Sequence, residues 1–411
     1  MAITGSSHLR SDQRLGCLQG FRGSPQRSPG DLGGVDPPGS GHCGTVEKAT
    51  CRWQMLVAWV IARMEPGGAQ LGGLRLIPAL RDHGITSRLF VGEANQGGQA
   101  LLSQAEVEFE VWGGGEALQY ACNRGFAEWL RPRLASADLV HAQMFGAWWA
   151  ASEAVAPGVP LVGSEHNAIR WPGRPRWAEM RRALGRLDTC FAHGPAARAT
   201  FLRLGLSPSR LQPGVSPIEP LSPHAIRRLP RPRLVFAGRL HPEKGPDLLL
   251  DALARLRPRV PAFLLGSGPL APSLRARART LGLARTVRLV GWQPRIGPWL
   301  AGATACVVPS RHESWSQTAV TAMAYRVPAV ATAVEGLPLT LAEGRGVLVA
   351  PENPDELAGA IRAALAGRSG VDFAGAQRYA ARFAPELVAA RYANVYRRLC
   401  GRPTAAVADA A

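Results

Sequence analysis

Short apolar runs alternate with amphipathic segments from about residue 55 to residue 400. Each run has the length of a strand and precedes a segment with helical periodicity, which is the pattern of a parallel α/β protein. The runs that predict buried strands in the first half are 56–61, 87–91, 107–112, 137–142, 159–163, 189–193 and 211–215. Those in the second half are 234–237, 262–265, 287–290, 305–308, 329–332 and 346–349.

The two halves are separated by residues 216–233, which contain five prolines and predict a linker. We expect one doubly wound α/β domain over 55–216 and a second over 217–371, with a ligand-binding cleft between them. A helix over 372–400 is predicted to close the fold, and 401–411 to form a loose tail.

Residues 1–52 have a different composition, with ten Gly, six Ser and four Pro and no hydrophobic periodicity. This composition predicts a disordered leader. The segment lacks the apolar core of a signal peptide. The first fold-like run begins at Met55, so either Met55 is the true start or the leader is dispensable.

The net charge of +18 comes from 48 Lys and Arg against 30 Asp and Glu. It favours a negatively charged partner, such as a sugar nucleotide, an anionic lipid or nucleic acid. Motifs typical of RNA-binding or zinc-finger proteins are missing from the sequence, so no nucleic-acid partner is expected. Seven cysteines without a C-x-x-C pair favour a reducing compartment. No apolar run is long enough for a membrane span.

The most informative stretch runs from Leu234 to Asp247, as an apolar strand, a loop and a helix start. Arg239 and Lys244 lie in the loop, and Asp247 is predicted to cap the following helix. Loops after parallel strands bind ligands in open α/β sheets, and helix N-termini favour anions. Lys48 is the only other lysine in a chain that otherwise uses arginine, which suggests that the function of position 244 requires the compact charge of a lysine.

Three further features carry candidate chemistry. Gly67-Gly68 at a strand-to-helix turn allow close approach of the backbone to a ligand, although tight-turn geometry explains them equally well. His166 follows a strand end beside Glu165 and is well placed for chemistry, whereas His141 is expected to be a core histidine. The segment 170–186 holds six arginines and Trp177, and is either a domain helix with a solvated face or an interfacial helix on anionic lipid.

Motifs in a fixed order resemble those of family 4 retaining glycosyltransferases with the GT-B fold, over about residues 55–400. That fold consists of two Rossmann-like doubly wound domains, with a C-terminal helix packing back on the N-terminal domain. The motifs that carry the resemblance are Pro66-Gly67-Gly68-Ala69, Asp138-Leu139-Val140-His141, Phe236-Ala237-Gly238-Arg239-Leu240, Glu243-Lys244-Gly245, Gly266-Ser267-Gly268-Pro269, Pro309-Ser310 with Glu313, and Gly346-Val347-Leu348-Val349 with Pro354.

The resemblance implies a role for each of these positions in binding a nucleotide-diphosphate sugar. Arg239 and Lys244 neutralise the donor diphosphate, Glu313 binds hydroxyls of the donor sugar, and His166 lies beside the transferred sugar. The remaining positions implied for donor binding are Gly67, Gly68, Gly266, Ser314, Trp315, Ser316 and Thr321. The family needs no metal, and the chain contains no Asp-x-Asp motif.

One departure from the family pattern concerns the donor ribose. The family has a second glutamate eight residues after the first, but position 321 is Thr. A carboxylate accepts hydrogen bonds from two hydroxyls, whereas a threonine hydroxyl is a single neutral partner. Either ribose binding is weaker in this chain, or another residue supplies the contact. Trp315-Ser316 in place of Phe-Gly is a milder change.

The expected activity is transfer of a sugar to an acceptor hydroxyl on a glycan, a lipid-linked molecule or a small molecule. An epimerase acting on sugar nucleotides and an inactive sugar-nucleotide-binding protein are the alternatives. A dehydrogenase is disfavoured because Gly266-Ser267-Gly268 lacks the third glycine of a dinucleotide fingerprint. We expect a cytoplasmic protein without cofactor or metal. Contact with the inner face of an anionic membrane is the alternative that applies if the segment around Trp177 is an interfacial helix. The donor base, the sugar and the acceptor are left open.

Overall fold

The computed structural model describes residues 3–4, 54–114, 118–166, 177–222, 226 and 228–404. The expected disordered leader lies outside these residues, except for Ile3–Thr4 (β1), which pairs antiparallel with Glu108–Val111 (β4). Most of the expected loose tail, from residue 405 onward, also lies outside them.

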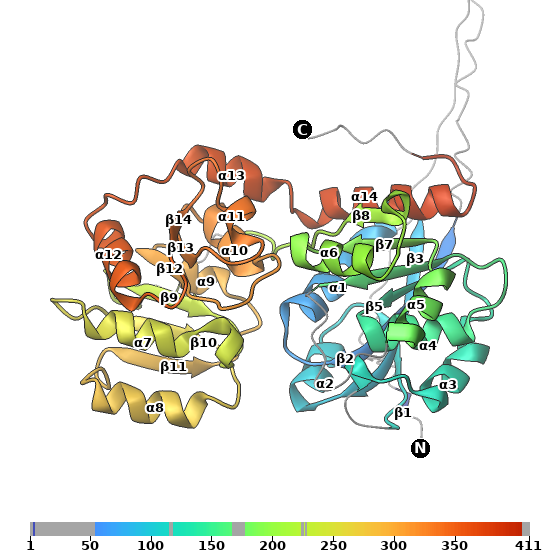
Figure 1. Ribbon diagram of the computed structural model, residues 1–411, viewed down its shortest axis with the longest axis horizontal. Helices are drawn as coiled ribbons and strands as arrows, with labels where there is room; N and C mark the ends of the chain where they lie inside the picture. The colour runs from blue at the N-terminus through green and yellow to red at the C-terminus, as the bar shows by residue number, and fades with distance from the viewer. Residues whose placement is uncertain are drawn as a thin grey trace, which may run out of the picture. The chain divides into compact units, whose positions relative to one another are not determined.

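The N-terminal half is built on a sheet with the strand order β1-β4-β3-β2-β5-β6-β7-β8, parallel throughout except for β1 (Figure 1). The central strand, β2, is almost completely buried, as its apolar sequence predicts. The parallel strands besides β4 are Met55–Met64 (β2), Ile85–Ala94 (β3), Leu139–Gln143 (β5), Leu161–Glu165 (β6), Thr189–Ala192 (β7) and Leu211–Pro213 (β8).

Helices connect these strands. The side chain of Asn123 caps the N-terminus of the helix that begins at Arg124, because it accepts a hydrogen bond from Phe126 N–H. The helical segments are Gly68–Ala79 (α1), Leu80–His83 (η1), Gln96–Ser103 (α2), Leu118–Tyr120 (η2), Arg124–Leu134 (α3), Phe145–Ala154 (α4), Trp177–Arg186 (α5), Pro195–Arg203 (α6) and Pro208–Arg210 (η3).

The C-terminal half has a parallel sheet with the order β11-β10-β9-β12-β13-β14. Its strands are Leu234–Ala237 (β9), Ala262–Leu265 (β10), Val287–Gly291 (β11), Ala305–Val308 (β12), Ala329–Thr332 (β13) and Val347–Val349 (β14). The helical segments that follow these strands are Pro242–Lys244 (η4), Pro246–Ala254 (α7), Ala271–Thr280 (α8), Gly297–Leu300 (α9), Gln317–Ala324 (α10), Leu337–Thr340 (α11) and Pro354–Leu365 (α12).

Both sheets reverse their strand order at one point, which confirms the predicted doubly wound, Rossmann-like architecture. The reversal lies between β2 and β5 in the first sheet and between β9 and β12 in the second. Ligands of such sheets bind beyond the carboxyl ends of the strands at this switch point. The loops after these four strands are therefore the places where a site is expected.

The predicted capping role of Asp247 is wrong. Gly245 precedes α7 with φ of 60°, and Asp247 lies in the first turn, where its carboxylate accepts from Arg311 Nη1 and Nη2 at 2.9 and 2.8 Å. The guanidinium holds the pKa of Asp247 below its usual value. A Cβ at position 245 would lie 1.9 Å from the carbonyl oxygen of Pro309, so both the dihedral angle and the space require glycine.

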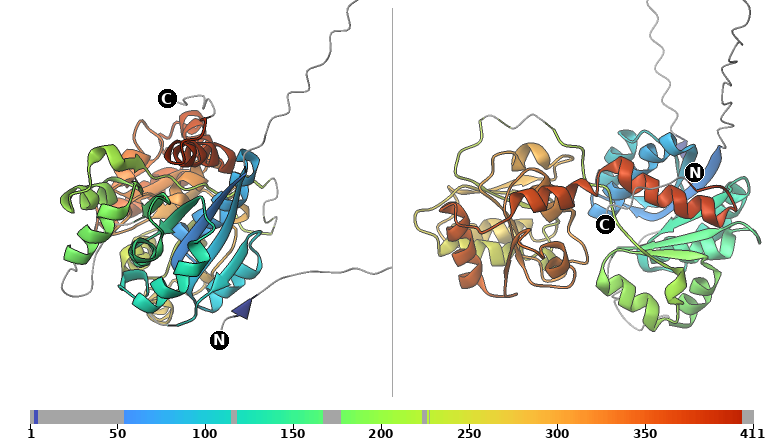
Figure 2. Two further views of the ribbon diagram at one scale, coloured as in Figure 1. Left: turned by 90° about the vertical axis from the view of Figure 1, so that its right-hand side faces the viewer. Right: turned by 90° about the horizontal axis from the view of Figure 1, so that it is seen from above.

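The C-terminal segment returns to the N-terminal half, as predicted, but as two helices and not one. Phe373–Ala381 (α13) packs against α10, and Pro385–Leu399 (α14) packs on α1 and η1 (Figure 2). The predicted continuous helix over 372–400 breaks before Pro385, because proline disfavours a helical conformation in the residue that precedes it. Arg397 Nη2 fixes α14 by donating to the carbonyl oxygen of His83 at 2.6 Å.

No helix among the described residues is both long enough and apolar enough to cross a membrane.

Candidate active site

A cavity of about 690 Å³ lies at the switch points of the two sheets. It is lined by the loops that follow β2, β6, β9, β10 and β12, and by the first turns of α1 and α10. Every residue that sequence analysis assigned to the site lines this cavity: Gly67, Gly68, His166, Arg239, Lys244, Gly266, Glu313, Ser314, Trp315, Ser316 and Thr321.

The glycine turn after β2 brings the backbone close to the C-terminal half. Gly67 is the N-cap of α1, and the carbonyl oxygen of Gly68 accepts a hydrogen bond from Gln317 Nε2 at 2.6 Å. Gln317 is the first residue of α10, and its Oε1 accepts from Arg75 Nη1 at 3.2 Å. The start of α10 is thus held against the start of α1, and the N-termini of both helices line the cavity.

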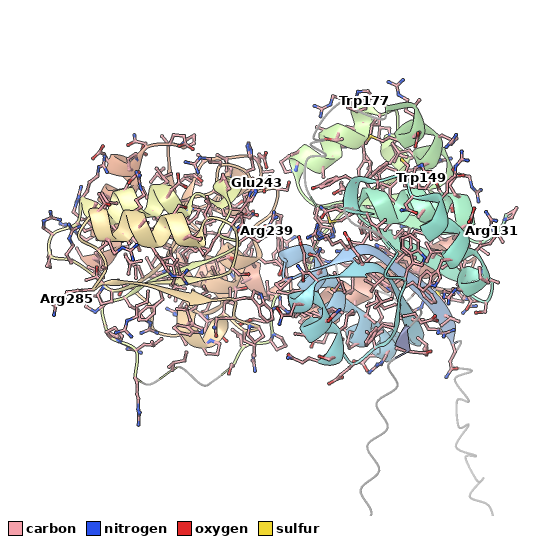
Figure 3. All side chains as sticks on the ribbon, turned by 90° about the horizontal axis from the view of Figure 1, so that it is seen from below. Arg131, Trp149, Trp177, Arg239, Glu243 and Arg285 are labelled. Carbon is pink, nitrogen blue, oxygen red and sulfur yellow. The ribbon has the colours of Figure 1, made fainter. Side chains whose placement is uncertain are left out.

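Arg239 and Lys244, the two cations predicted for the site, each form an ion pair with a glutamate. Lys244 Nζ lies 2.8 Å from Glu313 Oε2, with side-chain exposures of 22% and 12%, and Ser310 Oγ donates to the same oxygen at 3.3 Å. Arg239 is 44% exposed, and its Nη2 lies 3.2 Å from Glu243 Oε2 (Figure 3). An exposed pair of this kind contributes little to stability, so breaking it costs little free energy.

The loop after β12 is fixed from several sides. Ser314 and Ser316 are buried, and Ser316 caps α10 by accepting from Ala319 N–H. The carbonyl oxygen of Ser314 lies 2.1 and 1.8 Å from the positions that a Cβ on Gly194 and on Gly336 would take. Both positions therefore require glycine, because a side chain there would collide with the backbone of Ser314.

His166 lines the cavity together with a second histidine, His193. Its ring stacks on His193 at 3.7 Å, and its Nε2 lies 3.0 Å from Gln143 Nε2. Burial lowers the pKa of His166 to about 3, so the imidazole is neutral at physiological pH. A neutral imidazole at this place offers a hydrogen bond to a substrate hydroxyl and not a positive charge.

His141 is a core residue, as sequence analysis expected. It is fully buried, stacks on Trp59 at 4.1 Å, and contacts Tyr396 Oη at 2.5 Å and Ser164 Oγ at 2.7 Å. Tyr396 belongs to α14, so the C-terminal helix is hydrogen-bonded to the core of the N-terminal half.

Several residues that line the cavity were not predicted from the sequence. His193 follows β7 as His166 follows β6, a parallel that was visible in the pattern of strand ends. Arg75 comes from within α1, and Glu219 comes from the segment interpreted only as a proline-rich linker. Neither side chain belongs to a motif, so no local signal identified them.

Solved structures with the GT-B fold resemble this chain over most of its length. HepE from Anabaena in complex with UDP-glucose superposes with a TM-score of 0.70 at 21% identity, covering 84% of this chain and all of that one. Sucrose-phosphate synthase from Thermosynechococcus elongatus gives 0.68 at 21% identity, covering 85% and 100%. The fold is therefore that of the GT-B glycosyltransferases.

Family models place the chain within this class. The model described as Glycosyltransferase Family 4 matches residues 66–217, and the model described as Glycosyl transferases group 1 matches residues 231–367. The chain belongs to the family 4, or group 1, glycosyltransferases.

Curated relatives of the chain include several D-inositol 3-phosphate glycosyltransferases. That of Streptosporangium roseum is 33% identical over 58% of this chain and 64% of its own length. That of Catenulispora acidiphila is 40% identical over 40% of this chain and 43% of its own length. The chain spans about half the length of the curated relatives that it matches.

Proposed function

We propose that this protein is a retaining glycosyltransferase that moves a sugar from a nucleotide-diphosphate sugar to an acceptor hydroxyl. The observation that carries the proposal is the meeting of Arg239, Lys244 and Glu313 with the glycine turn of α1 in one cavity, at the switch points of both sheets. The complex of HepE with UDP-glucose supports a donor of this class, and the names of the curated relatives support glycosyl transfer.

In the proposed reaction, negative charge develops on the phosphate oxygen that leaves the donor sugar. The bond between the anomeric carbon and the donor phosphate oxygen breaks, and the acceptor oxygen bonds to the same face of that carbon. The acceptor proton passes to the departing phosphate oxygen. Arg239, Lys244 and the N-terminus of α10 stabilise the charge on this oxygen, and preorganised groups of this kind supply much of a rate enhancement. No metal takes part in the proposed reaction.

The remaining residues position the donor sugar. Glu313 accepts hydrogen bonds from its hydroxyls, because a carboxylate has four lone-pair sites and the pair with Lys244 and Ser310 occupies one oxygen only. His166, neutral and held by Gln143, meets the sugar from the N-terminal half.

The proposal is tested by incubating the protein with UDP-, GDP- and ADP-sugars and a panel of polyol, glycan and lipid-linked acceptors. We expect one donor to give a glycoside whose anomeric configuration, read by proton NMR, equals that of the donor. Inversion of configuration would contradict the proposed mechanism. Isomerisation of the sugar nucleotide without an acceptor would support an epimerase, and binding without turnover would support a binding protein, the alternative that Thr321 motivates.

We also propose contact of α5 with an anionic membrane. Trp177 is 39% exposed at the outer tip of the N-terminal half (Figure 3), and Arg181, Arg182 and Arg186 are exposed on the same helix. We expect phosphatidylglycerol vesicles at low salt to bind the protein. Binding should weaken in Trp177→Ala and stay unchanged in Arg285→Ala, an exposed arginine of the C-terminal half. Equal binding of all three proteins would contradict the role of α5.

A further inference from the structure

Thr321 offers little to a ribose. It lies in the second turn of α10, at the wall of the cavity. Its hydroxyl already donates to the carbonyl oxygen of Gln317 at 2.7 Å, so no hydroxyl proton is left for a ligand. Of the two possibilities that Thr321 leaves open, weaker ribose binding or a contact from another residue, the second requires a carboxylate elsewhere on the cavity wall.

Glu219 lies beside the face of α10 that carries Thr321. Gln317, Thr321 and Tyr325 follow one another at intervals of four residues on this face. Arg75 connects Glu219 to the turn before Thr321, because its guanidinium contacts Glu219 Oε2 at 3.6 Å and Gln317 Oε1 at 3.2 Å.

Contacts around Gly297 place Glu219 beside the following turn as well. A Cβ on Gly297 would lie 2.4 Å from Glu219 Oε1 and 2.2 Å from Tyr325 Oη. Glu219 Oε1 and Tyr325 Oη therefore lie close to each other, both beside the position that a Cβ of residue 297 would take. Glu219, Thr321 and Ile296 all line the cavity.

The other carboxylates of the described cavity wall have closer cationic or histidine partners. Glu313 pairs with Lys244 at 2.8 Å, Glu65 with Arg63 at 3.0 Å, Glu243 with Arg239 at 3.2 Å and Glu335 with His312 at 3.2 Å. Glu219 is 3% exposed and lies 3.6 Å from Arg75, and it accepts from the backbone N–H groups of Ile296 and Gly297.

These contacts hold the carboxylate of Glu219 in place but do not occupy all of its hydrogen-bond acceptor sites. The N–H of Ile296 donates to Oε2 and the N–H of Gly297 donates to Oε1, whereas a carboxylate has about four acceptor sites. Burying a carboxylate is costly unless it is hydrogen-bonded and paired, and the two N–H groups and Arg75 meet this condition. Each oxygen of Glu219 retains an acceptor site for a hydroxyl group.

We propose that Glu219 binds the two ribose hydroxyls of the donor nucleotide, in place of the glutamate that position 321 lacks. This inference rests on the proposed function, because it requires a nucleotide in the cavity. It assigns a ligand-binding residue to the segment that connects the two halves, so ribose recognition and the geometry of this connection depend on the same side chain.

The test compares ribonucleotides with nucleotides that lack both hydroxyls. UDP, GDP and ADP and their 2′,3′-dideoxy forms are titrated by calorimetry into the full chain, into Glu219→Gln and into Glu343→Gln. Glu343 is 81% exposed and serves as the matched control. We expect Glu219→Gln to weaken binding of the preferred ribonucleotide about 10- to 100-fold, the range of a charge-assisted hydrogen bond. Binding of its dideoxy form should stay the same, and Glu343→Gln should change neither.

Equal weakening of both nucleotides, or no change in either, would overturn the inference, since Glu219 would then act only on the local structure or not at all. Failure of every nucleotide to bind the unchanged protein would overturn the proposed function itself.

A second variant keeps the test valid if Glu219→Gln folds poorly. Thr321→Glu restores the family residue, and it should add little ribose preference while Glu219 is present. A gain of about tenfold in this variant would show that the ribose site was empty, which contradicts the inference.

Discussion

Replacing Lys244 by methionine is the sharpest single perturbation of the proposed diphosphate site. The change keeps most of the side-chain volume and removes the charge. Glu313 would then keep only the hydrogen bond from Ser310, and the cavity wall would gain a net negative charge at the place proposed for a diphosphate. Two effects therefore act in the same direction, loss of an attractive contact and gain of a repulsive one.

The magnitude follows from the contact that is lost. A hydrogen bond between charged groups contributes about 1.5–3 kcal/mol, which corresponds to a loss of about 10- to 150-fold in nucleotide affinity. A double variant, Lys244→Met with Glu313→Gln, also removes the uncompensated carboxylate. It should bind a free nucleoside diphosphate better than Lys244→Met alone, because the repulsion has gone.

Calorimetric titration of UDP, GDP and ADP measures both effects, with thermal unfolding as a check that each variant is folded. The matched control is Arg277→Met, which removes a cation that pairs with Asp251 at 2.6 Å and does not line the cavity. The control should bind nucleotide like the unchanged protein. Affinity of Lys244→Met within about twofold of that value would refute the assignment of Lys244 to the diphosphate.

Three further predictions concern stability. Burial holds the pKa of His141 at about 3 against 6.5 in the unfolded chain, so the unfolded state binds more protons between these values. The free energy of unfolding, measured by urea titration, should fall by about 1.4 kcal/mol per pH unit below pH 6.5 from this group, and a flat profile would contradict it. Tyr396→Phe removes one of the two hydrogen-bond partners of His141 and leaves Ser164, and it should lower the free energy of unfolding by about 1–3 kcal/mol. Gly245→Ala should destabilise the protein more than Gly282→Ala, which has a similar φ of 66° but open space around it; equal effects would refute the close approach to Pro309.

The alternation of apolar runs was enough to predict the two parallel sheets, because strands buried on both faces read as continuous apolar segments. Element ends were harder to predict. The start of α3 depends on the cap at Asn123, and the break before Pro385 separates two segments that share one helical periodicity. The role of Asp247 was missed because its partner Arg311 lies in a distant loop.

The candidate site was predictable where residues lie in motifs next to strand ends. Arg239, Lys244 and Glu313 are of this kind, and they line one cavity because parallel strands end at the same edge of a sheet. Glu219 and Arg75 were not predictable in this way. They reach the cavity through tertiary contacts that no local pattern encodes, and their importance becomes visible only beside Thr321.

Lysine modification tests the central claim, that a nucleotide-diphosphate sugar binds at Lys244. The chain has only two lysines, so an amine-reactive reagent followed by mass spectrometry reports on Lys244 with Lys48 as an internal reference. The account predicts that one class of nucleotide sugar slows modification of Lys244 in a saturable manner and leaves Lys48 unchanged. Modification of Lys244 at the same rate with every nucleotide sugar, at concentrations up to the millimolar range, would contradict it.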